Sequence, residues 1–357
     1  MREGQMRSYS VPRWAGTVIS AVVATASLTG LAACAGGGSS GGGGDQVTLR
    51  LGYFPNLTHA TPIVGVEKGI FADKLGAGLK LQTKQFNAGG SAIEALFSGA
   101  IDATYIGPSP AINAWAKSNG KAVKIVAGAA SGGVFLVTKP EITTWEDLRG
   151  KTIATPQLGN TQDVALRYWL KQKGLQTTKE GGGDVKVKPQ DNAVTVDAYS
   201  AGAIDGAWVP EPTASRLTAK GAKVLLDERD LWSSGKFVIT HLLVSTDFYN
   251  KHRDVVKRLV AGSVASNKFI NDNPAEAQQL VSEGIGKLTG KPLDPKLTAE
   301  AWKSITFLDD PLASTLREGA QHAEEIGLLE PVDLNGIYDL TLLNEVLKEN
   351  GSAEVLT

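Results

Sequence analysis

A four-residue stretch, Gly99-Ala100-Ile101-Asp102, occurs again as Gly202-Ala203-Ile204-Asp205, 103 residues further along the chain. The flanking residues keep the same register, so that Tyr105 corresponds to Trp208. In each copy a helical pattern ends at the glycine, and Ile-Asp leads into a short apolar strand pattern. We interpret the copies as equivalent elements of two similar α/β lobes. Two such lobes facing each other leave a cleft at the carboxyl ends of their strands.

Strand and helix patterns alternate on both sides of the first copy. The expected strands cover residues 47–53, 79–86, 103–106, 123–127 and 134–138, and the expected helices cover 61–68, 91–98 and 110–118. The alternation resumes with a strand at 152–154, a helix at 163–173 and a strand at 185–188, and helical patterns dominate from residue 247 onward. Such alternation predicts βαβ crossovers. The predicted fold is therefore α/β, with mixed, mostly parallel sheets in two lobes around a central cleft.

The composition limits the classes of function. The 357 residues include 36 Lys and Arg, 37 Asp and Glu, four His and one Cys. The formal net charge of −1 argues against nucleic acid as a partner. A single cysteine excludes a disulfide framework and a cysteine-rich zinc site.

The N-terminus has the pattern of an export signal. Arg2, Arg7 and Arg13 precede an uncharged, largely apolar run that ends in Leu31-Ala32-Ala33-Cys34. This ending resembles the bacterial lipobox, in which the cysteine receives a diacylglycerol group. We predict a signal peptide at residues 1–33 and lipidation of Cys34. The alternative is an ordinary signal peptide with an incidental Cys34.

Residues 34–45, which follow the signal peptide, consist mainly of Gly and Ser. A segment of this composition has few side chains to bury and behaves as a flexible tether. A lipid, a tether and a globular body predict an exported protein that is anchored to the outer face of the cell membrane.

Residues 46–357 contain the motifs Leu51-Gly52-Tyr53-Phe54-Pro55, Glu67-Lys68-Gly69-Ile70-Phe71, residues 95–102, residues 148–154 and Trp208-Val209-Pro210-Glu211-Pro212. Together these motifs resemble one family, the periplasmic solute-binding proteins of ABC transporters in the nitrate/sulfonate/taurine-binding group. The resemblance implies a type II periplasmic-binding-protein-like fold, with crossovers near residues 134–139 and 237–244. Lobe one would then comprise residues 46–137 plus 241–357, and lobe two residues 138–240.

Three glycine-containing turns are candidate anion sites because each opens an expected helix. A helix N-terminus carries free N–H groups and about half a positive charge. The turns are Gly89-Gly90-Ser91, Gly107-Pro108-Ser109-Pro110 and Gly159-Asn160-Thr161-Gln162. We expect Ser109 to cap its helix, with Pro110 at the first helical position. The alternative for each turn is plain helix capping without a ligand.

Other candidates follow from their positions in the expected lobes. Asn56 and His59 follow the first strand, and Ser131 and Gly132 adjoin the first crossover. We expect Trp208 to wall the cleft against an apolar part of the ligand. Two interpretations of Glu211 are open, namely pairing with a ligand ammonium group and bracing the hinge. The predicted ligand-binding residues are Asn56, His59, Gly90, Ser91, Gly107, Ser109, Ser131, Gly132, Gln157, Asn160, Thr161, Trp208 and Glu211.

The predicted function is capture of a small organic anion and its delivery to an ABC permease by a monomeric protein. None of the three turns contains Lys or Arg, and a tryptophan and a carboxylate lie nearby, which favours an aliphatic sulfonate or taurine. Nitrate, bicarbonate and a thiamine-precursor pyrimidine, which the family also binds, are alternatives.

An enzyme is disfavoured, and no cofactor or metal is expected. Outside the Gly/Ser tether at residues 34–45, the sequence has no Gly-x-Ser-x-Gly elbow, no Gly-x-Gly-x-x-Gly turn and no P-loop, and its histidines lack metal-ligand spacing. A lipoprotein sensor or adhesin is a further alternative, although such a protein does not need a two-lobed body with a cleft.

Overall fold

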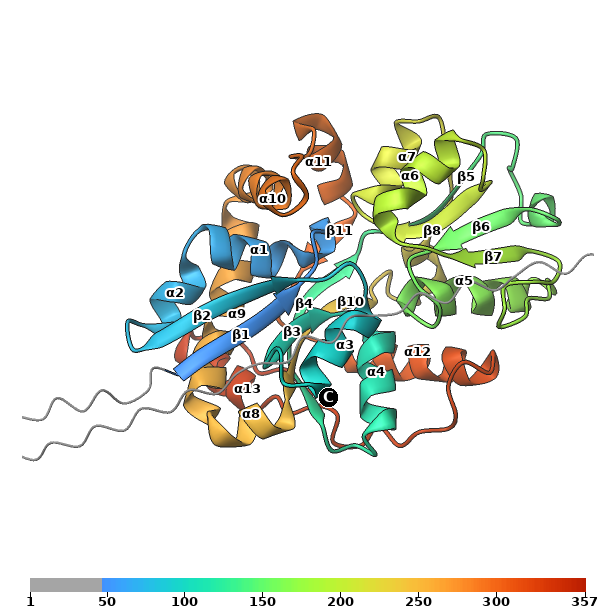
Figure 1. Cartoon of the computed structure of the whole chain (residues 1–357). Helices are drawn as coiled ribbons and strands as arrows, with labels where there is room; N and C mark the ends of the chain where they lie inside the picture. The colour runs from blue at the N-terminus through green and yellow to red at the C-terminus, as the bar shows by residue number, and fades with distance from the viewer. Residues whose placement is uncertain (1–46) are drawn as a thin grey trace, which may run out of the picture. The chain divides into compact units, whose positions relative to one another are not determined.

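Two mixed β-sheets form the framework of residues 47–357, which are the residues that the computed structural model describes (Figure 1). The predicted signal peptide, Cys34 and the tether at residues 34–45 lie outside the described residues. None of the helices in residues 47–357 is long and apolar enough to cross a membrane.

The first sheet has six strands and the second has five. In spatial order, the first contains β2 (Leu79–Gln85), β1 (Val47–Tyr53), β3 (Ala103–Ile106), β10 (Val238–Ser245), β4 (Val123–Gly132) and β11 (Ile305–Phe307). The second contains β7 (Lys186–Pro189), β6 (Thr152–Thr155), β8 (Gly206–Pro210), β5 (Val134–Thr138) and β9 (Lys223–Asp227).

The two sheets share one topology. In the first sheet β1 pairs in parallel with β2 and β3, and β10 runs antiparallel between β3 and β4. In the second, β6 pairs in parallel with β7 and β8, and β5 runs antiparallel between β8 and β9. The prediction of two similar α/β units with mixed sheets is therefore confirmed. The expectation that the sheets are mostly parallel was wrong, because four strand pairs among the described residues are parallel and five are antiparallel, and the crossing strands supply most of the antiparallel pairs.

The chain passes between the sheets twice. β4 of the first sheet ends at Gly132, and β5 of the second begins at Val134. The chain returns between the end of β9 at Asp227 and the start of β10 at Val238. Each crossing supplies the antiparallel strand of the sheet that it enters.

Helices cover the faces of the two sheets, and loops connect the helices to the ends of the strands. Their bounds are α1 (Ala60–Glu67), α2 (Ile70–Leu75), α3 (Gly89–Phe97), α4 (Pro108–Lys117), α5 (Thr161–Gln172), α6 (Asn192–Ser200), α7 (Thr213–Thr218), α8 (Thr246–Lys251), α9 (Arg253–Asp272), α10 (Pro274–Thr289), α11 (Pro295–Trp302), α12 (Ala313–Glu325) and α13 (Thr341–Glu349). Short 3₁₀ segments are η1 (Leu57–His59), η2 (Glu146–Leu148) and η3 (Glu228–Leu231).

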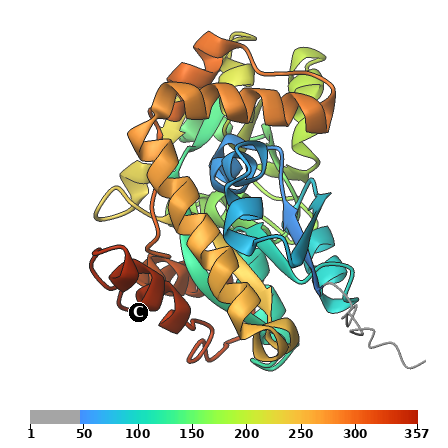
Figure 2. The same cartoon turned by 90° about the vertical axis from the view of Figure 1, so that its left-hand side faces the viewer.

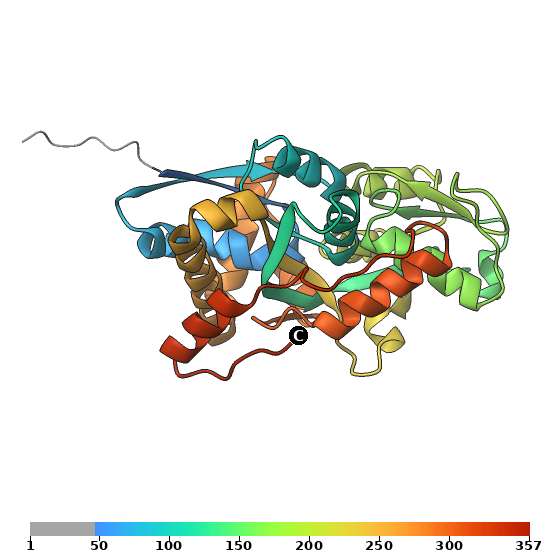
Figure 3. The ribbon, with the colours of Figure 1, turned by 90° about the horizontal axis from the view of Figure 1, so that it is seen from below.

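Two long helices show how the layers pack. α9 packs against α1, α2 and α13 on one side of the first sheet (Figure 2). α12 follows β11 of the first sheet but packs on α5 of the second (Figure 3). In that contact the rings of Tyr168 and His322 stack with centroids 3.6 Å apart. α12 therefore joins the two sheet layers outside the crossings.

Three helices begin two residues before their predicted starts. We expected helices at 91–98, 110–118 and 163–173, whereas α3, α4 and α5 begin at Gly89, Pro108 and Thr161. Glycine, proline and threonine are tolerated in the first turn, where the N–H groups have no partner within the helix. β4 is also longer than expected, because its small residues beyond Ala127 still pair with β10.

The repeated aspartate performs the same structural task in both copies. Asp102 Oδ2 accepts hydrogen bonds from the backbone N–H of Arg50, at 2.8 Å, and from its Nε, at 2.9 Å. Asp205 Oδ2 accepts from the backbone N–H of Thr152, at 2.9 Å, and its Oδ1 pairs with Lys139. Each carboxylate thus ties the loop before a central strand to the neighbouring parallel strand.

We predict that Asp102→Ala lowers the free energy of unfolding by about 1–3 kcal/mol, because a buried backbone N–H loses its acceptor. Asp205→Ala is expected to have an effect of the same order. Urea unfolding followed by circular dichroism measures both. The control is Asp247→Ala, which removes an exposed i,i+4 ion pair with Lys251 and is expected to cost less than about 0.5 kcal/mol. An Asp102→Ala variant as stable as this control would contradict the assignment.

Candidate functional site

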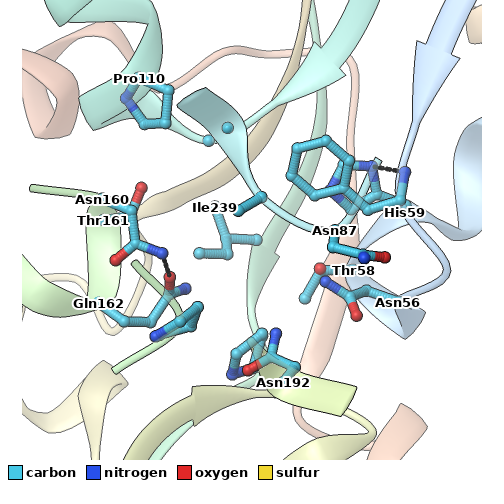
Figure 4. A pocket seen from close by; sticks show the side chains of 16 residues that line it. Asn56, Thr58, His59, Asn87, Pro110, Asn160, Thr161, Gln162, Asn192 and Ile239 are labelled. Atoms are coloured by element: carbon cyan, nitrogen blue, oxygen red, sulfur yellow. Dashed lines mark hydrogen bonds between the residues drawn. The ribbon is translucent and has the colours of Figure 1, made fainter. Parts of the chain in front are cut away.

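One cavity lies where the loops at the strand ends of both sheets meet (Figure 4). Its volume is about 40 Å³. Its walls come from loops that follow β1, β2 and β3 of the first sheet and β6 and β7 of the second, together with residues of β8 and β10. The lining residues are Phe54, Asn56, Thr58, His59, Asn87, Ala88, Gly89, Gly107, Pro110, Pro156, Asn160, Thr161, Gln162, Asn192, Pro210 and Ile239.

Four helices begin at this cavity. Gly89 starts α3, Gly107 is the N-cap of α4, Thr161 starts α5 and Asn192 starts α6, and all four residues line the cavity. Each helix N-terminus carries about half a positive charge and presents backbone N–H groups. The convergence of the four N-termini favours an anion in the cavity.

The turn at α4 differs from its prediction. Its N-cap is Gly107, Pro108 is the first helical residue, and Ser109 makes no capping hydrogen bond. Because Pro108 and Pro110 have no N–H, Ser109 alone among the first three helical residues retains a backbone donor. Ser109 is buried and is not among the lining residues. This turn therefore contributes fewer donors to the cavity than expected.

The side chains that line the cavity are polar but uncharged. Five carboxamides, those of Asn56, Asn87, Asn160, Gln162 and Asn192, surround it, and none of its sixteen described lining residues is Lys, Arg, Asp or Glu. Figure 4 shows Asn160, Thr161 and Gln162 on one side of the cavity and Asn56, Thr58 and His59 on the other. Asn160 Nδ2 donates to Gln162 Oε1 at 3.2 Å, which leaves the amide nitrogen of Gln162 as a donor.

His59 is a neutral hydrogen-bond donor. It is 3% exposed and stacks on Phe54, and its Nδ1 accepts the backbone N–H of Phe54 at 3.3 Å. Burial lowers its pKa to about 3, so the ring is uncharged at neutral pH. Because Nδ1 is the acceptor, the proton of the neutral ring lies on Nε2. His59 therefore supplies one N–H group without a cationic charge.

A buried aspartate, Asp163, fixes the turn at residues 159–162, where α5 begins, through hydrogen bonds. The carboxylate of Asp163 accepts hydrogen bonds from Gly159 N, Thr155 Oγ1 and Arg167 Nε at 2.8–2.9 Å. The N–H of Asp163 in turn donates to Asn160 Oδ1 at 3.0 Å. Asn160 is the N-cap of α5, and asparagine is among the preferred N-cap residues, so the sequence contained a signal for this interaction. The network fixes the wall that Asn160, Thr161 and Gln162 present.

Five of the predicted ligand-binding residues line the cavity. They are Asn56, His59, Gly107, Asn160 and Thr161. Gly90 and Gln157 lie at its edge and bind each other, because the N–H of Gly90 donates to Gln157 Oε1 at 3.0 Å. Ser91 is exposed, and its hydroxyl donates to the carbonyl of Ala88 within its own turn.

Ser131 and Gly132 serve the crossing between the sheets rather than the cavity. Ser131 Oγ accepts the N–H of Phe237 at 3.1 Å, which ties the two crossing segments together. Gly132 has φ +81°, and a Cβ there would lie 2.5 Å from the carbonyl oxygen of Ser304. Only glycine fits this position, for a reason that involves no ligand.

The expectation that Trp208 walls the cleft needs correction. Trp208 is fully buried in the core of the second sheet, where its ring packs edge-on against Trp169. Its Nε1 donates to the buried carboxylate of Glu228 at 2.7 Å. The side chain therefore belongs to the hydrophobic core that packs against β8, and it does not line the cavity.

The Glu211 carboxylate binds the first turn of α7 and forms no ion pair in the described residues, so its side chain shows neither the ligand-pairing role nor a salt bridge across the hinge. Glu211 is 3% exposed, and its carboxylate accepts hydrogen bonds from the N–H and hydroxyl of Ser215 at the start of α7. Its main chain joins the sheets, because its carbonyl accepts from Leu57 N and its N–H donates to the carbonyl of Gly133. Glu211 is not among the lining residues of the cavity.

Several lining residues escaped sequence reasoning. Asn87, Asn192 and Ile239 line the cavity but were not singled out, and Gln162 was named only as part of the candidate turn at residues 159–162. Asn87 follows an expected strand, as Asn56 does, which is a signal that would have identified it. Asn192 follows β7 and starts α6. This connection corresponds, in the second sheet, to the connection between β2 and α3 in the first. In residues 47–357, no cluster of three His, Cys, Asp or Glu side chains is placed to hold a metal ion.

Comparison with known proteins adds a family and a fold. A model described as the NMT1-like family matches residues 42–285. The taurine-binding periplasmic protein of Escherichia coli (strain K12) is 29% identical over 201 residues, 56% of this chain and 60% of that protein. A Bacillus subtilis (strain 168) protein named "Putative aliphatic sulfonates-binding protein" is 25% identical over 356 residues, 93% of this chain and 97% of that protein. The solved structure of the alkanesulfonate-binding protein SsuA from Xanthomonas axonopodis pv. citri bound to MOPS has a TM-score of 0.68 at 19% identity, over 82% of this chain and 98% of that one.

We predict that stability falls as the pH is lowered from 6.5 towards 3, in part because of His59. Its folded pKa of about 3 lies below the ordinary value of 6.5, so the unfolded chain binds one more proton in this interval. The contribution is about 1.4 kcal/mol per pH unit. Urea unfolding at pH 7 and pH 5 should show a smaller loss for His59→Gln than for the unaltered protein. Equal losses would contradict a buried neutral His59.

Proposed function

The chain belongs to the NMT1-like family, and we propose that it is the solute-binding component of an ABC import system. Two relatives support this proposal, because one is named for binding taurine and the other for binding aliphatic sulfonates. The similarity to the second relative extends along most of its length. The proposal includes a permease as partner and a monomeric binding protein.

The convergence of four helix N-termini on a cavity without charged side chains carries the proposal. Main-chain N–H groups, carboxamides and the Nε2–H of His59 are all donors that an oxyanion accepts from. Because the cavity lies between two sheet layers and most of its lining residues are buried, these interactions are stronger than at a fully exposed surface. The donor set suits a small anion.

We favour a short aliphatic sulfonate as the ligand. The cavity of about 40 Å³ leaves little room for a tail, and Ile239 and the prolines provide apolar contacts. Taurine is less well supported than the sequence indicated, since its ammonium group would meet no carboxylate and would face the positive ends of four helices. Nitrate, bicarbonate and a pyrimidine remain alternatives that a ligand screen distinguishes.

Capture by closure of the two lobes is the proposed mechanism. The lobe bounds expected from the sequence, 46–137 plus 241–357 and 138–240, are retained as a proposal. A rotation would change the backbone at the crossings, at Gly133 and between Asp227 and Val238, and would shift the contact between α12 and α5. The ligand favours the closed state because donors from both sheets reach it only there.

Binding without chemistry fits the side chains in the cavity. His59, with its pKa lowered to about 3, does not act as a base near neutral pH. The sixteen described lining residues contain no Ser, Cys, Lys or carboxylate that would serve as a nucleophile. These features support a transport role over a hydrolase of similar fold.

A thermal-shift screen tests the proposed function. We predict that methanesulfonate or ethanesulfonate at a hundredfold excess over Kd stabilises the protein by about 2.7 kcal/mol. Gly107→Leu should lower the affinity about tenfold or more, because a Cβ there would lie 2.7 Å from Thr161 Oγ1 across the cavity. Gly78→Leu is the matched control, since a Cβ at Gly78 has no neighbour within 4 Å. A shift by pyrimidines alone, or equal affinities for both variants, would contradict the assignment.

Location outside the cytoplasm with a lipid on Cys34 is also proposed. Cys34 is the only thiol of the chain and ends the lipobox-like Leu31-Ala32-Ala33-Cys34. We predict that cells grown with an alkyne-bearing fatty acid label the unaltered protein but not Cys34→Ala. Ser40→Ala, in the predicted tether, serves as the control and should remain labelled. An unlabelled native protein would indicate an ordinary signal peptide.

A further inference from the structure

One side-chain hydrogen bond joins the two sheet layers at the edge of the cavity. Gln157 lies on the loop between β6 and α5 of the second sheet, and Gly90 lies in the first turn of α3, which follows β2 of the first sheet. The N–H of Gly90 donates to Gln157 Oε1 at 3.0 Å. A relative movement of the two sheets must break this bond.

The absence of a side chain at residue 90 makes the bond sterically feasible. A Cβ at Gly90 would lie 2.7 Å from Nε2 and 3.1 Å from Oε1 of Gln157. The carboxamide therefore occupies the space that any other residue would fill. Gly90 has no positive φ, so its backbone conformation does not itself require glycine. The requirement comes from Gln157.

Gln157 is tied to the wall of the cavity. Its carbonyl oxygen accepts the N–H of Asn160 at 3.2 Å, and Asn160 lines the cavity and caps α5. A further hydrogen bond joins the two sheet layers: Asn113 Nδ2, on α4, donates to the carbonyl of Gly159 at 3.4 Å. A ligand that displaces the α5 turn away from α3 therefore also displaces Gln157.

We propose that Gln157 and Gly90 form a closure latch that makes the site selective for short ligands. This inference rests on the proposed function, because it assumes that the sheets close around a solute. A ligand that fits the cavity of about 40 Å³ allows the latch to form. A longer ligand holds the loops apart, and its complex forgoes the hydrogen bond. Gln157 contacts α3 and not the ligand, so it acts as a positioning residue.

Isothermal titration with methanesulfonate and hexanesulfonate tests the latch. We expect Gln157→Ala to weaken methanesulfonate binding about tenfold and hexanesulfonate binding less than about threefold, which reduces selectivity for the short ligand. Gly90→Ala should weaken methanesulfonate binding to a similar extent in the native background. In the Gln157→Ala background the same Gly90→Ala change should have almost no effect, because the clash is gone. Equal losses for both ligands, or additive effects of the two changes, would overturn the latch.

Hydrogen exchange at saturating methanesulfonate, or at saturating nitrate or pyrimidine if the thermal-shift screen selects one of these, separates this inference from the proposed function, because the latch belongs to the closed state. The amides in the first turn of α3 should exchange about tenfold faster in Gln157→Ala than in the native protein, while those of α9 remain unchanged. Unchanged exchange in α3 would overturn the latch whatever the protein binds. Faster exchange together with no sulfonate binding would support the contact between the layers but contradict the proposed ligand and its selection by length.

Discussion

Parallel strands of one sheet end at the same edge, and this constraint places the candidate site. β1, β2 and β3 end at one edge of the first sheet, and β6, β7 and β8 do so in the second. The helices that follow must begin where the strands end, so their N-termini point into the space between the sheets. In the proposed function the donors for an anion thus come largely from the main chain, and the cavity needs no Lys or Arg.

Close approach of the two layers depends on a few small residues and on shared strands. Each sheet takes its antiparallel strand, β10 or β5, from a crossing segment, so neither layer is complete without the chain that joins it to the other. Gly90 and Gly107 leave room for Gln157 and Thr161 from the opposite layer. The fold therefore permits a close approach of the two layers beside the cavity, and in the proposed latch this approach selects ligands by length.

The sequence predicted the architecture more completely than the site. The Gly-Ala-Ile-Asp repeat revealed two equivalent units because its glycine and aspartate perform backbone tasks that few residues can replace. Side-chain direction was harder to predict. Trp208 corresponds to Tyr105 in the repeat, and both side chains are fully buried, so the repeat argued for a core role that the prediction overlooked. Asn87 and Asn192 were overlooked although each follows a strand, the position that singled out Asn56, because neither belongs to a glycine-containing turn pattern or a repeat. The pairing of Gly90 with Gln157 depends on how the layers approach, which no local pattern records.

The central claim is that helix N-termini of both sheets hold an oxyanion without a cationic side chain. A crystal structure of the protein with 2-bromoethanesulfonate tests it most directly, since anomalous scattering from bromine fixes the orientation of the ligand. The account predicts the sulfonate oxygens within hydrogen-bond distance of first-turn N–H groups of α3 and α5 and of His59 Nε2, with the bromine towards Ile239. A sulfonate bound to surface Lys or Arg residues, with none between the sheets, would contradict it.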